Sequence, residues 1–180
     1  MNECKPLDAD EDDEGDQPAS DEVNPGDEAA LRVWRAECPE LQALWDESQP
    51  VTAWQGVTFG EAGDADAGRV VSIRLGRKGL TGDVPAALGG LTALKRLGLS
   101  GNQLTTVPAE LGGLTALERL NLHGNQLTSL PEAFGGLTGL SELYLSQNQL
   151  TGVPADLGRS VQVDPIKLTL KAPGTKRLKR

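Results

Sequence analysis

The sequence contains few of the residues on which metal binding and catalysis depend. Among 180 residues there are one histidine and two cysteines, Cys4 and Cys38, and they form no cluster with metal-ligand spacing. Aromatic residues make up only 3% of the chain, so a hydrophobic core has to be aliphatic. No apolar run approaches the roughly 18 residues of a membrane-spanning helix. We therefore expect no metal, no cofactor and no membrane span.

Signatures of the common enzyme classes are missing as well. The chain has no G-x-x-x-x-G-K-S/T loop, no G-x-G-x-x-G at the start of a helix, no H-E-x-x-H and no G-x-S-x-G. The sequence predicts no nucleophile facing the only histidine, His123, and a general base must lie within hydrogen-bond reach of the group that it deprotonates. The chain is therefore predicted not to be an enzyme.

Charge is concentrated at the two ends of the chain. The net charge is −9, yet residues 29–170 are nearly neutral: residues 1–28 hold twelve acidic residues and one basic residue, and residues 171–180 hold five basic residues and no acidic one. A nearly neutral domain argues against nucleic-acid binding by the domain itself. The basic tail at residues 171–180 leaves polyanion binding open as an alternative.

The first 66 residues divide into two segments. Residues 1–26 are predicted to be a disordered acidic tail, because their carboxylates repel one another and bury no apolar surface. Residues 27–66 are predicted to be an N-terminal cap that begins with a helix, with Asp27 as the N-cap residue. Three apolar residues share one face of this helix: Leu31, Trp34 and Cys38.

An internal repeat dominates the rest of the chain. The pattern L-x-x-L-x-L-x-x-N occurs three times with a period of 23 residues, at residues 94–102, 117–125 and 140–148. An earlier copy begins at Val70, 24 residues before the next. In each copy two aliphatic residues, such as Leu97 and Leu99, alternate with residues that are not aliphatic. This alternation is typical of a short strand with one face inward. Paired glycines, such as Gly112 and Gly113, are predicted to turn the chain toward the next strand.

This pattern closely resembles the leucine-rich repeat. The resemblance implies an α/β solenoid, namely a short leucine-rich-repeat arc with a parallel, concave β-sheet and a helical N-terminal cap. It places four repeats at residues 67–159. After them, the alternation of Ile166, Leu168 and Leu170 is compatible with a C-terminal capping strand at residues 160–170, before the basic tail. In this family the asparagine of the pattern is buried and satisfies the backbone of the adjacent turn. The resemblance therefore implies a ladder formed by Asn102, Asn125 and Asn148.

The segment around the tryptophans resembles the N-terminal cap of plant-like leucine-rich-repeat proteins. Trp34, Trp45 and Trp54 are expected to lie in the core of this cap. Secreted versions of the cap carry a cysteine pair, and the present chain has no cysteines around Trp54, which favours a reducing compartment. The N-terminus also lacks the basic segment and apolar run of a secretory signal. Together these features predict a cytoplasmic location.

Function is expected on the concave surface of the sheet. Side chains that flank the strand leucines face outward there, so a partner can determine their identity. The predicted partner-binding residues are Arg74, Arg96, Arg119, Asn121, His123, Glu142 and Tyr144, and Ser72 is expected on the same face. Arginine and tyrosine are enriched at protein interfaces. We therefore predict a non-catalytic module for protein–protein interaction whose partner contacts this face.

Three alternatives stay open at the level of the sequence. The chain could be part of a larger kinase- or GTPase-associated signalling protein, because leucine-rich repeats often lie beside such domains. The acidic tail could fold over the concave arginines until a partner displaces it. The chain also departs from the leucine spacing after Arg159, so an uncapped C-terminal repeat could form a homodimer.

Overall fold

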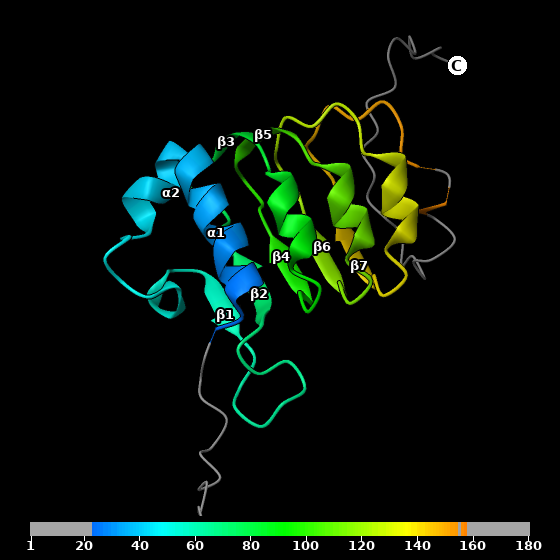
Figure 1. Ribbon diagram of the computed structural model, residues 1–180. Helices are drawn as coiled ribbons and strands as arrows, with labels where there is room; N and C mark the ends of the chain where they lie inside the picture. Colours follow the sequence, from blue (N-terminus) through cyan, green and yellow to red (C-terminus); the bar gives the residue numbers. More distant parts are fainter. Residues whose placement is uncertain (1–22, 155, 158–180) are drawn as a thin grey trace, which may run out of the picture.

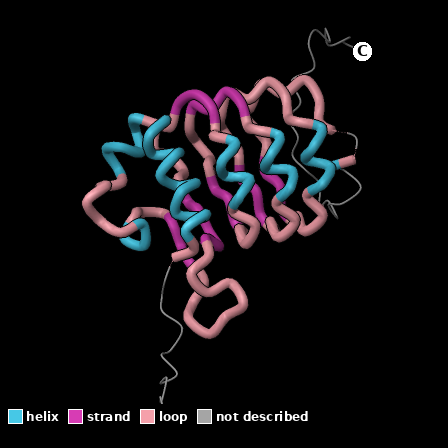
Figure 2. The backbone as a smooth tube through the Cα atoms, viewed as in Figure 1, coloured by secondary structure: helices cyan, strands magenta, loops and turns pink. Residues whose placement is uncertain are grey.

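The protein is a short arc of stacked coils with a helical cap at one end. The computed structural model describes residues 23–154, 156 and 157. Each repeat contributes a strand to a sheet on one side of the arc, and 3-10 helices form a layer on the other side (Figures 1 and 2). The predicted α/β solenoid with a parallel sheet and a helical N-terminal cap is confirmed.

The main sheet has five strands in the order β1-β2-β4-β6-β7. The strands are β1 (Val57–Phe59), β2 (Val70–Arg74), β4 (Arg96–Gly98), β6 (Arg119–Asn121) and β7 (Glu142–Tyr144). The last four come one from each repeat and pair in parallel, whereas β1 belongs to the cap and pairs antiparallel with β2. The cap therefore extends the sheet by one strand at its N-terminal edge.

The sequence does not predict a second, two-stranded sheet that the structure contains. Strands β3 (Thr81–Asp83) and β5 (Gln103–Thr106) pair in parallel. All three residues of β3 are exposed, so this strand lacks the alternation of apolar and polar residues that identifies strands in a sequence. Strand β3 pairs with β5 of the next repeat, and the pattern of residues within one repeat carries no information about this pairing.

A proline precedes each 3-10 helix of the opposite layer. The helices of this layer are η2 (Ala86–Gly90), η3 (Ala109–Gly113) and η4 (Glu132–Gly136), and η1 (Val51–Ala53) lies in the cap. The prolines before η2, η3 and η4 have extended backbone, with φ of −70°, −76° and −61°. These angles match the value that the pyrrolidine ring imposes, so the sequence fixes where each short helix starts.

The paired glycines have a role other than the predicted one. Gly112 and Gly113 are the last residues of η3 and do not form a separate turn. A Cβ atom on Gly112 would lie 2.2 Å from the carbonyl oxygen of Ala133, so η3 and η4 pack too closely for a side chain at this position. The prediction is wrong because it considered only the conformation of the local backbone. Glycine is required at position 112 by the close packing of the neighbouring coil.

Aliphatic side chains from every coil form one continuous core. Residues at one register position stack across the parallel strands and are buried, namely Ile73, Leu97, Leu120 and Leu143. The 3-10 layer and the coil after it contribute Leu88, Leu111, Phe134 and Leu157, which are also buried. Because each coil buries its leucines against its neighbours, stability is approximately a sum of nearest-neighbour interactions.

The predicted asparagine ladder is confirmed. Asn102 Oδ1 accepts hydrogen bonds from two backbone N–H groups of the preceding coil, at 3.0 and 3.1 Å. Its Nδ2 donates to one carbonyl of the preceding coil and one of its own coil, both at 2.9 Å. Asn125 and Asn148 each accept from one backbone N–H group and donate to the same pair of carbonyl positions. Each amide therefore joins two successive coils.

Helix α1 (Pro25–Glu37) begins two residues before the predicted start of the cap helix. Its N-cap is Asn24, whose Oδ1 accepts hydrogen bonds from the backbone N–H groups of Gly26 and Asp27 at 3.0 and 3.2 Å. The assignment of Asp27 as the N-cap is therefore wrong. A cap residue ends the helix at the surface, whereas Asp27 lies inside the first turn and is only 1% exposed.

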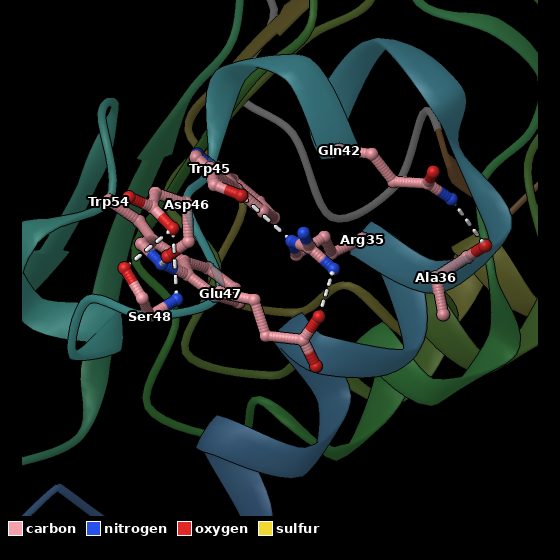
Figure 3. Close-up of polar contacts among 8 residues, drawn as sticks. All are labelled: Arg35, Ala36, Gln42, Trp45, Asp46, Glu47, Ser48 and Trp54. Carbon is pink, nitrogen blue, oxygen red and sulfur yellow. Dashed lines mark hydrogen bonds and ion pairs between the residues drawn. The ribbon is translucent and has the colours of Figure 1, made fainter.

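The three tryptophans are buried in the cap, as predicted. Trp45 stacks on Trp54 with ring centroids 4.8 Å apart and meets Trp34 edge to face at 6.0 Å. The indole N–H groups of Trp45 and Trp54 each donate to a backbone carbonyl of the cap at 2.9 Å. Figure 3 shows Arg35 joining this group: its Nε donates to the Trp45 carbonyl at 2.7 Å, and its Nη1 pairs with Glu47 at 3.0 Å.

The remainder of the cap follows the sequence pattern. Leu31 of α1 and Cys38, which directly follows this helix, are both buried. Helix α2 (Pro39–Leu44) starts at the proline that prevents α1 from continuing. Other predicted segments lie outside the described residues: most of the acidic tail, the capping strand at 160–170 and the basic tail at 171–180.

Candidate binding surface on the open sheet face

The face of the main sheet that points away from the core, which we call the open sheet face, carries two columns of residues. Strand register places Ser72, Arg96, Arg119 and Glu142 in the first column and Arg74, Gly98, Asn121 and Tyr144 in the second. Side chains of a strand alternate between its two faces, so both columns flank the buried leucine column. Six of the seven predicted binding residues therefore lie in these two columns, and His123 follows β6.

A shallow pocket with a volume of about 310 Å³ lies over β2, β4 and β6. It is lined by Arg74, Gly76, Arg96, Leu97, Gly98, Ser100, Arg119 and Asn121. Two of the lining residues are glycines, and the missing side chains leave the space between the arginines. Four of the predicted binding residues line this pocket, whereas His123, Glu142 and Tyr144 do not.

Arg119 is paired with Glu142 on the neighbouring strand. Its Nη2 donates a short hydrogen bond to Glu142 Oε1, and Tyr144 Oη donates to Glu142 Oε2 at 2.8 Å. The hydrogen bonds from Arg119 and then from Tyr144 lower the pKa of Glu142. The same contacts raise the pKa values of Arg119 and Tyr144. The charge of Arg119 is therefore largely neutralised at the C-terminal end of the sheet.

Arg74 and Arg96 differ from Arg119 in having no such partner. Both side chains are exposed. Within the described part of the chain, neither guanidinium group makes a hydrogen bond or an ion pair. A guanidinium carries five N–H donors and stays protonated in proteins. The pocket is therefore bordered by two cationic groups whose donors are available to a ligand.

His123 faces a hydroxyl group, contrary to the prediction. Its Nδ1 lies 2.7 Å from Ser146 Oγ in the next coil, and its backbone N–H donates to Asn121 Oδ1 at 3.1 Å. The prediction considered motifs along the chain, whereas the register of the repeats brings the serine next to the histidine. In a catalytic triad a carboxylate holds the histidine on its other side, and the described residues provide no such carboxylate. We interpret the pair as a structural contact between coils.

Ser72 is buried, although the sequence predicts it on the outward face. It is 4% exposed, and its Oγ has no hydrogen-bond partner in the described structure. Its neighbours in register are Arg96 on one side and Thr58 of β1 on the other. The repeat pattern alone does not include β1, so the sequence could not show that the cap flanks this position.

The described residues do not suggest metal chemistry. They contain no group of three or more histidine, cysteine, aspartate or glutamate side chains that could hold a metal ion. No helix among them has the length and apolar character needed to cross a bilayer. What the open sheet face does offer is a set of hydrogen-bond donors, two available positive charges and one exposed aromatic ring, which are the means of noncovalent recognition.

Comparisons with known proteins agree with this architecture. A family model described as "Leucine rich repeat" matches residues 69–127, and one described as "Leucine Rich repeats (2 copies)" matches residues 115–157. A comparison with curated proteins finds no match.

Several solved structures are similar to the chain. The leucine-rich-repeat ectodomain of the receptor kinase SOBIR1 from Arabidopsis thaliana is 30% identical, with 72% of this chain and 70% of that chain covered and a TM-score of 0.58. A chain of the BIR3–SERK2 complex from Arabidopsis thaliana is 28% identical, with 74% and 76% covered and a TM-score of 0.63. A chain of the PEPR1–AtPEP1 structure is 29% identical, with 76% and 20% covered and a TM-score of 0.65.

The fold and the open sheet face define a repeat solenoid that presents a sheet surface, an architecture typical of non-catalytic interaction scaffolds. The particular family follows from the matched repeats and from the similarity to the SOBIR1 ectodomain. The chain belongs to the leucine-rich repeat family.

Proposed function

We propose that this chain is a non-catalytic protein-binding module that contacts a protein partner through the open sheet face. The observation that carries the proposal is the pocket bordered by two exposed arginines that have no hydrogen-bond or ion-pair partner among the described residues. The fold does not need these side chains for packing, because the leucines of the same strands form the core. One of the similar structures is described as a BIR3–SERK2 complex, and the description of another pairs PEPR1 with AtPEP1; both support recognition as the use of the fold.

The residues on this face suit different roles in binding. Arg74 and Arg96 can donate hydrogen bonds to acidic groups of a partner. Tyr144 is 47% exposed and offers a rigid aromatic surface, and tyrosine and arginine are the residues that most often dominate interface energies. The ion pair between Arg119 and Glu142 leaves the far end of the face without net charge. The face therefore has a polarity along the arc, which would orient a partner.

A binding comparison between three forms of the full chain tests the proposal. The first is the wild type, and the second carries Arg96→Ala, Arg119→Ala and Tyr144→Ala on the open sheet face. The third carries Glu110→Ala and Glu132→Ala, which are exposed on η3 and η4 in the opposite layer. Partners captured by the wild type are identified by mass spectrometry, purified and titrated against each form.

We expect the open-face variant to lose at least about tenfold in affinity, because interface hot spots of these residue types contribute 2 kcal/mol or more. The opposite-layer variant should bind like the wild type. A partner that binds the open-face variant as tightly as the wild type would refute the assignment of the face.

Three finer expectations stay predictions. A cytoplasmic location is tested by cell fractionation. A homodimer formed through the C-terminal repeat is tested by sedimentation analysis of the full chain at several concentrations. An association with kinase or GTPase signalling proteins is tested by the identities of the captured partners.

A further inference from the structure

We propose that the pocket beside Arg74 and Arg96 binds side-chain carboxylates of an acidic peptide segment in the protein partner. This inference rests on the proposed function and adds the chemistry of the ligand. It depends on three features of the open sheet face: available donors, space between them, and the loss of positive charge at one end.

The donors are available because no side chain or backbone group in the described part of the chain pairs with them. Arg96 and Arg119 occupy adjacent positions of one column, yet among residues 23–154, 156 and 157 only Arg119 of these two has a carboxylate partner, Glu142. Arg74 stands on the neighbouring strand in the other column. Guanidinium groups match carboxylates in geometry, since two parallel N–H groups can bind both oxygens at once. Arg74 and Arg96 can therefore hold one or two carboxylates without breaking an existing ion pair.

Glycine provides the space for a ligand between the arginines. Gly98 lies in register between Arg74 and Asn121, where any other residue would place a side chain over the pocket. The fold does not demand glycine there: a Cβ atom at this position would meet only ordinary van der Waals neighbours, with the Ile73 carbonyl oxygen at 3.7 Å. An unconstrained glycine in the floor of a cationic pocket points to a ligand that occupies the space.

The charge pattern favours a peptide over a uniform polyanion. Glu142 follows Arg96 and Arg119 in the same column, and its ion pair with Arg119 leaves no net charge there, so a nucleic acid or polyphosphate that extends along the column meets positive charge at one end only. A peptide can place acidic residues opposite the arginines and a neutral or basic residue opposite Glu142. Adjacent strands are about 4.8 Å apart, so Arg96 and Glu142 are separated by about 10 Å, which roughly three residues of extended peptide span.

The test uses fluorescence anisotropy with the full chain and synthetic peptides whose termini are blocked. The probe carries two glutamates followed three residues later by a lysine, and a second version carries the charges in reverse order. A matched peptide has glutamine in place of glutamate. Inorganic tripolyphosphate serves as the uniform polyanion in competition experiments.

Four variants separate charge, space and position. Arg74→Ala with Arg96→Ala removes the available guanidinium groups, and Gly98→Leu fills the pocket while it leaves every charge in place. Glu142→Gln releases Arg119 from its ion pair. Arg32→Ala removes one positive charge from α1, outside the sheet, and serves as the control. Circular dichroism and thermal melting verify that each variant is folded.

We expect at least one glutamate peptide to bind, with at least a tenfold loss for the glutamine peptide, for Arg74→Ala with Arg96→Ala, and for Gly98→Leu. Glu142→Gln should bind the acidic peptide severalfold more tightly, and Arg32→Ala should bind it unchanged. Tripolyphosphate should compete poorly with the wild type and better with Glu142→Gln.

Three results would overturn the proposal: no binding of either glutamate peptide, equal binding of the glutamine peptide, or stronger binding of tripolyphosphate than of the peptides. Binding that emerges only after the acidic residues at positions 8–14 of the chain are made neutral would assign the pocket to the chain's own N-terminal segment and would equally overturn it. The proposed function fails differently, since it fails when the open-face variant keeps its protein partner.

Discussion

Asp27 of helix α1 binds both the side chain of Arg69 and the backbone of Val70, where the first parallel strand starts. Its Oδ2 accepts hydrogen bonds from Arg69 Nε at 3.0 Å and from the Val70 N–H at 2.8 Å, and its Oδ1 accepts from Arg69 Nη2 at 3.1 Å. The hydrogen bonds from the Arg69 guanidinium to Asp27 raise the pKa of Arg69. Asp27 is 1% exposed and Arg69 28% exposed, so the contact is a largely buried join between the cap and the repeats.

The first prediction concerns this join. Asp27→Asn keeps the shape of the side chain but leaves a mostly buried guanidinium without its charge partner, so we expect a loss of about 3 kcal/mol in the free energy of unfolding. The neighbouring Glu28 forms a half-exposed ion pair with Arg32, one helical turn away, and Glu28→Gln should change stability by no more than about 0.5 kcal/mol. Urea denaturation of both variants measures the difference. Equal losses would show that Asp27 contributes no more than a surface charge.

The second prediction concerns the asparagine ladder. Asn102→Ala removes four hydrogen bonds, two of them to backbone N–H groups of the preceding coil, and leaves buried backbone groups without partners. We expect a loss of about 3 kcal/mol. Asn148 accepts from one backbone N–H group where Asn102 accepts from two, and it is only half-buried. Water can therefore replace part of the hydrogen bonding that Asn148→Ala removes, and we expect a loss of about 1 kcal/mol. Urea denaturation measures the free energy of unfolding of both variants. A larger loss for Asn148→Ala than for Asn102→Ala would contradict the role assigned to the buried asparagines.

The sequence was sufficient for the features that recur with the repeat. The strand positions, the stacking of Leu97, Leu120 and Leu143, and the buried asparagines all follow from residue types spaced 23 apart. A period of this kind reports contacts between coils, because each coil repeats the position of the one before it. The same logic placed Arg96, Arg119 and Glu142 on one face.

Features that depend on a single pair of neighbouring coils could not be predicted. The pairing of His123 with Ser146, the burial of Ser72 beside β1 and the pocket floor at Gly98 each need the register of two particular strands. The ion pair between Arg119 and Glu142 also depends on the register of two particular strands. It distinguishes Arg119 from Arg74 and Arg96, which have no ion pair within the described residues. The pocket and the arginines that border it could therefore be identified only from the three-dimensional structure.

The third prediction separates two adjacent glycines that look identical in the sequence. At Gly112 a Cβ atom would meet the Ala133 carbonyl oxygen at 2.2 Å, whereas at Gly113 it would have no neighbour within 4 Å. Gly112→Ala should force η3 and η4 apart and cost about 2 kcal/mol or more, as overpacked substitutions do. Gly113→Ala should be neutral or stabilise by up to about 1 kcal/mol, because alanine restricts the unfolded chain. Thermal and urea unfolding of the two variants should thus change in opposite directions or by clearly different amounts.

The last prediction concerns the thiol of Cys38 at the junction of α1 and α2. Burial, followed by its hydrogen bond to Glu40 Oε2 at 3.1 Å, raises the pKa of Cys38 from 9.0 to about 11. The same bond is the largest of those that lower the pKa of Glu40. A raised thiol pKa favours the protonated form in the folded state, so its contribution to stability is complete below pH 9 and is lost as the pH rises through about 11.

This shift can be measured by alkylation, because only the thiolate is nucleophilic. At pH 9 about 1% of a thiol with a pKa near 11 is ionised, compared with about half of one with a pKa of 9.0. In full chain with Cys4→Ala, iodoacetamide should therefore modify Cys38 at least about 50-fold more slowly in the folded protein than in guanidinium chloride. Adding Glu40→Gln should raise the folded rate severalfold, since it removes the neighbouring negative charge. Folded and unfolded rates that agree within a factor of two would contradict both the burial of this thiol and its contact with Glu40.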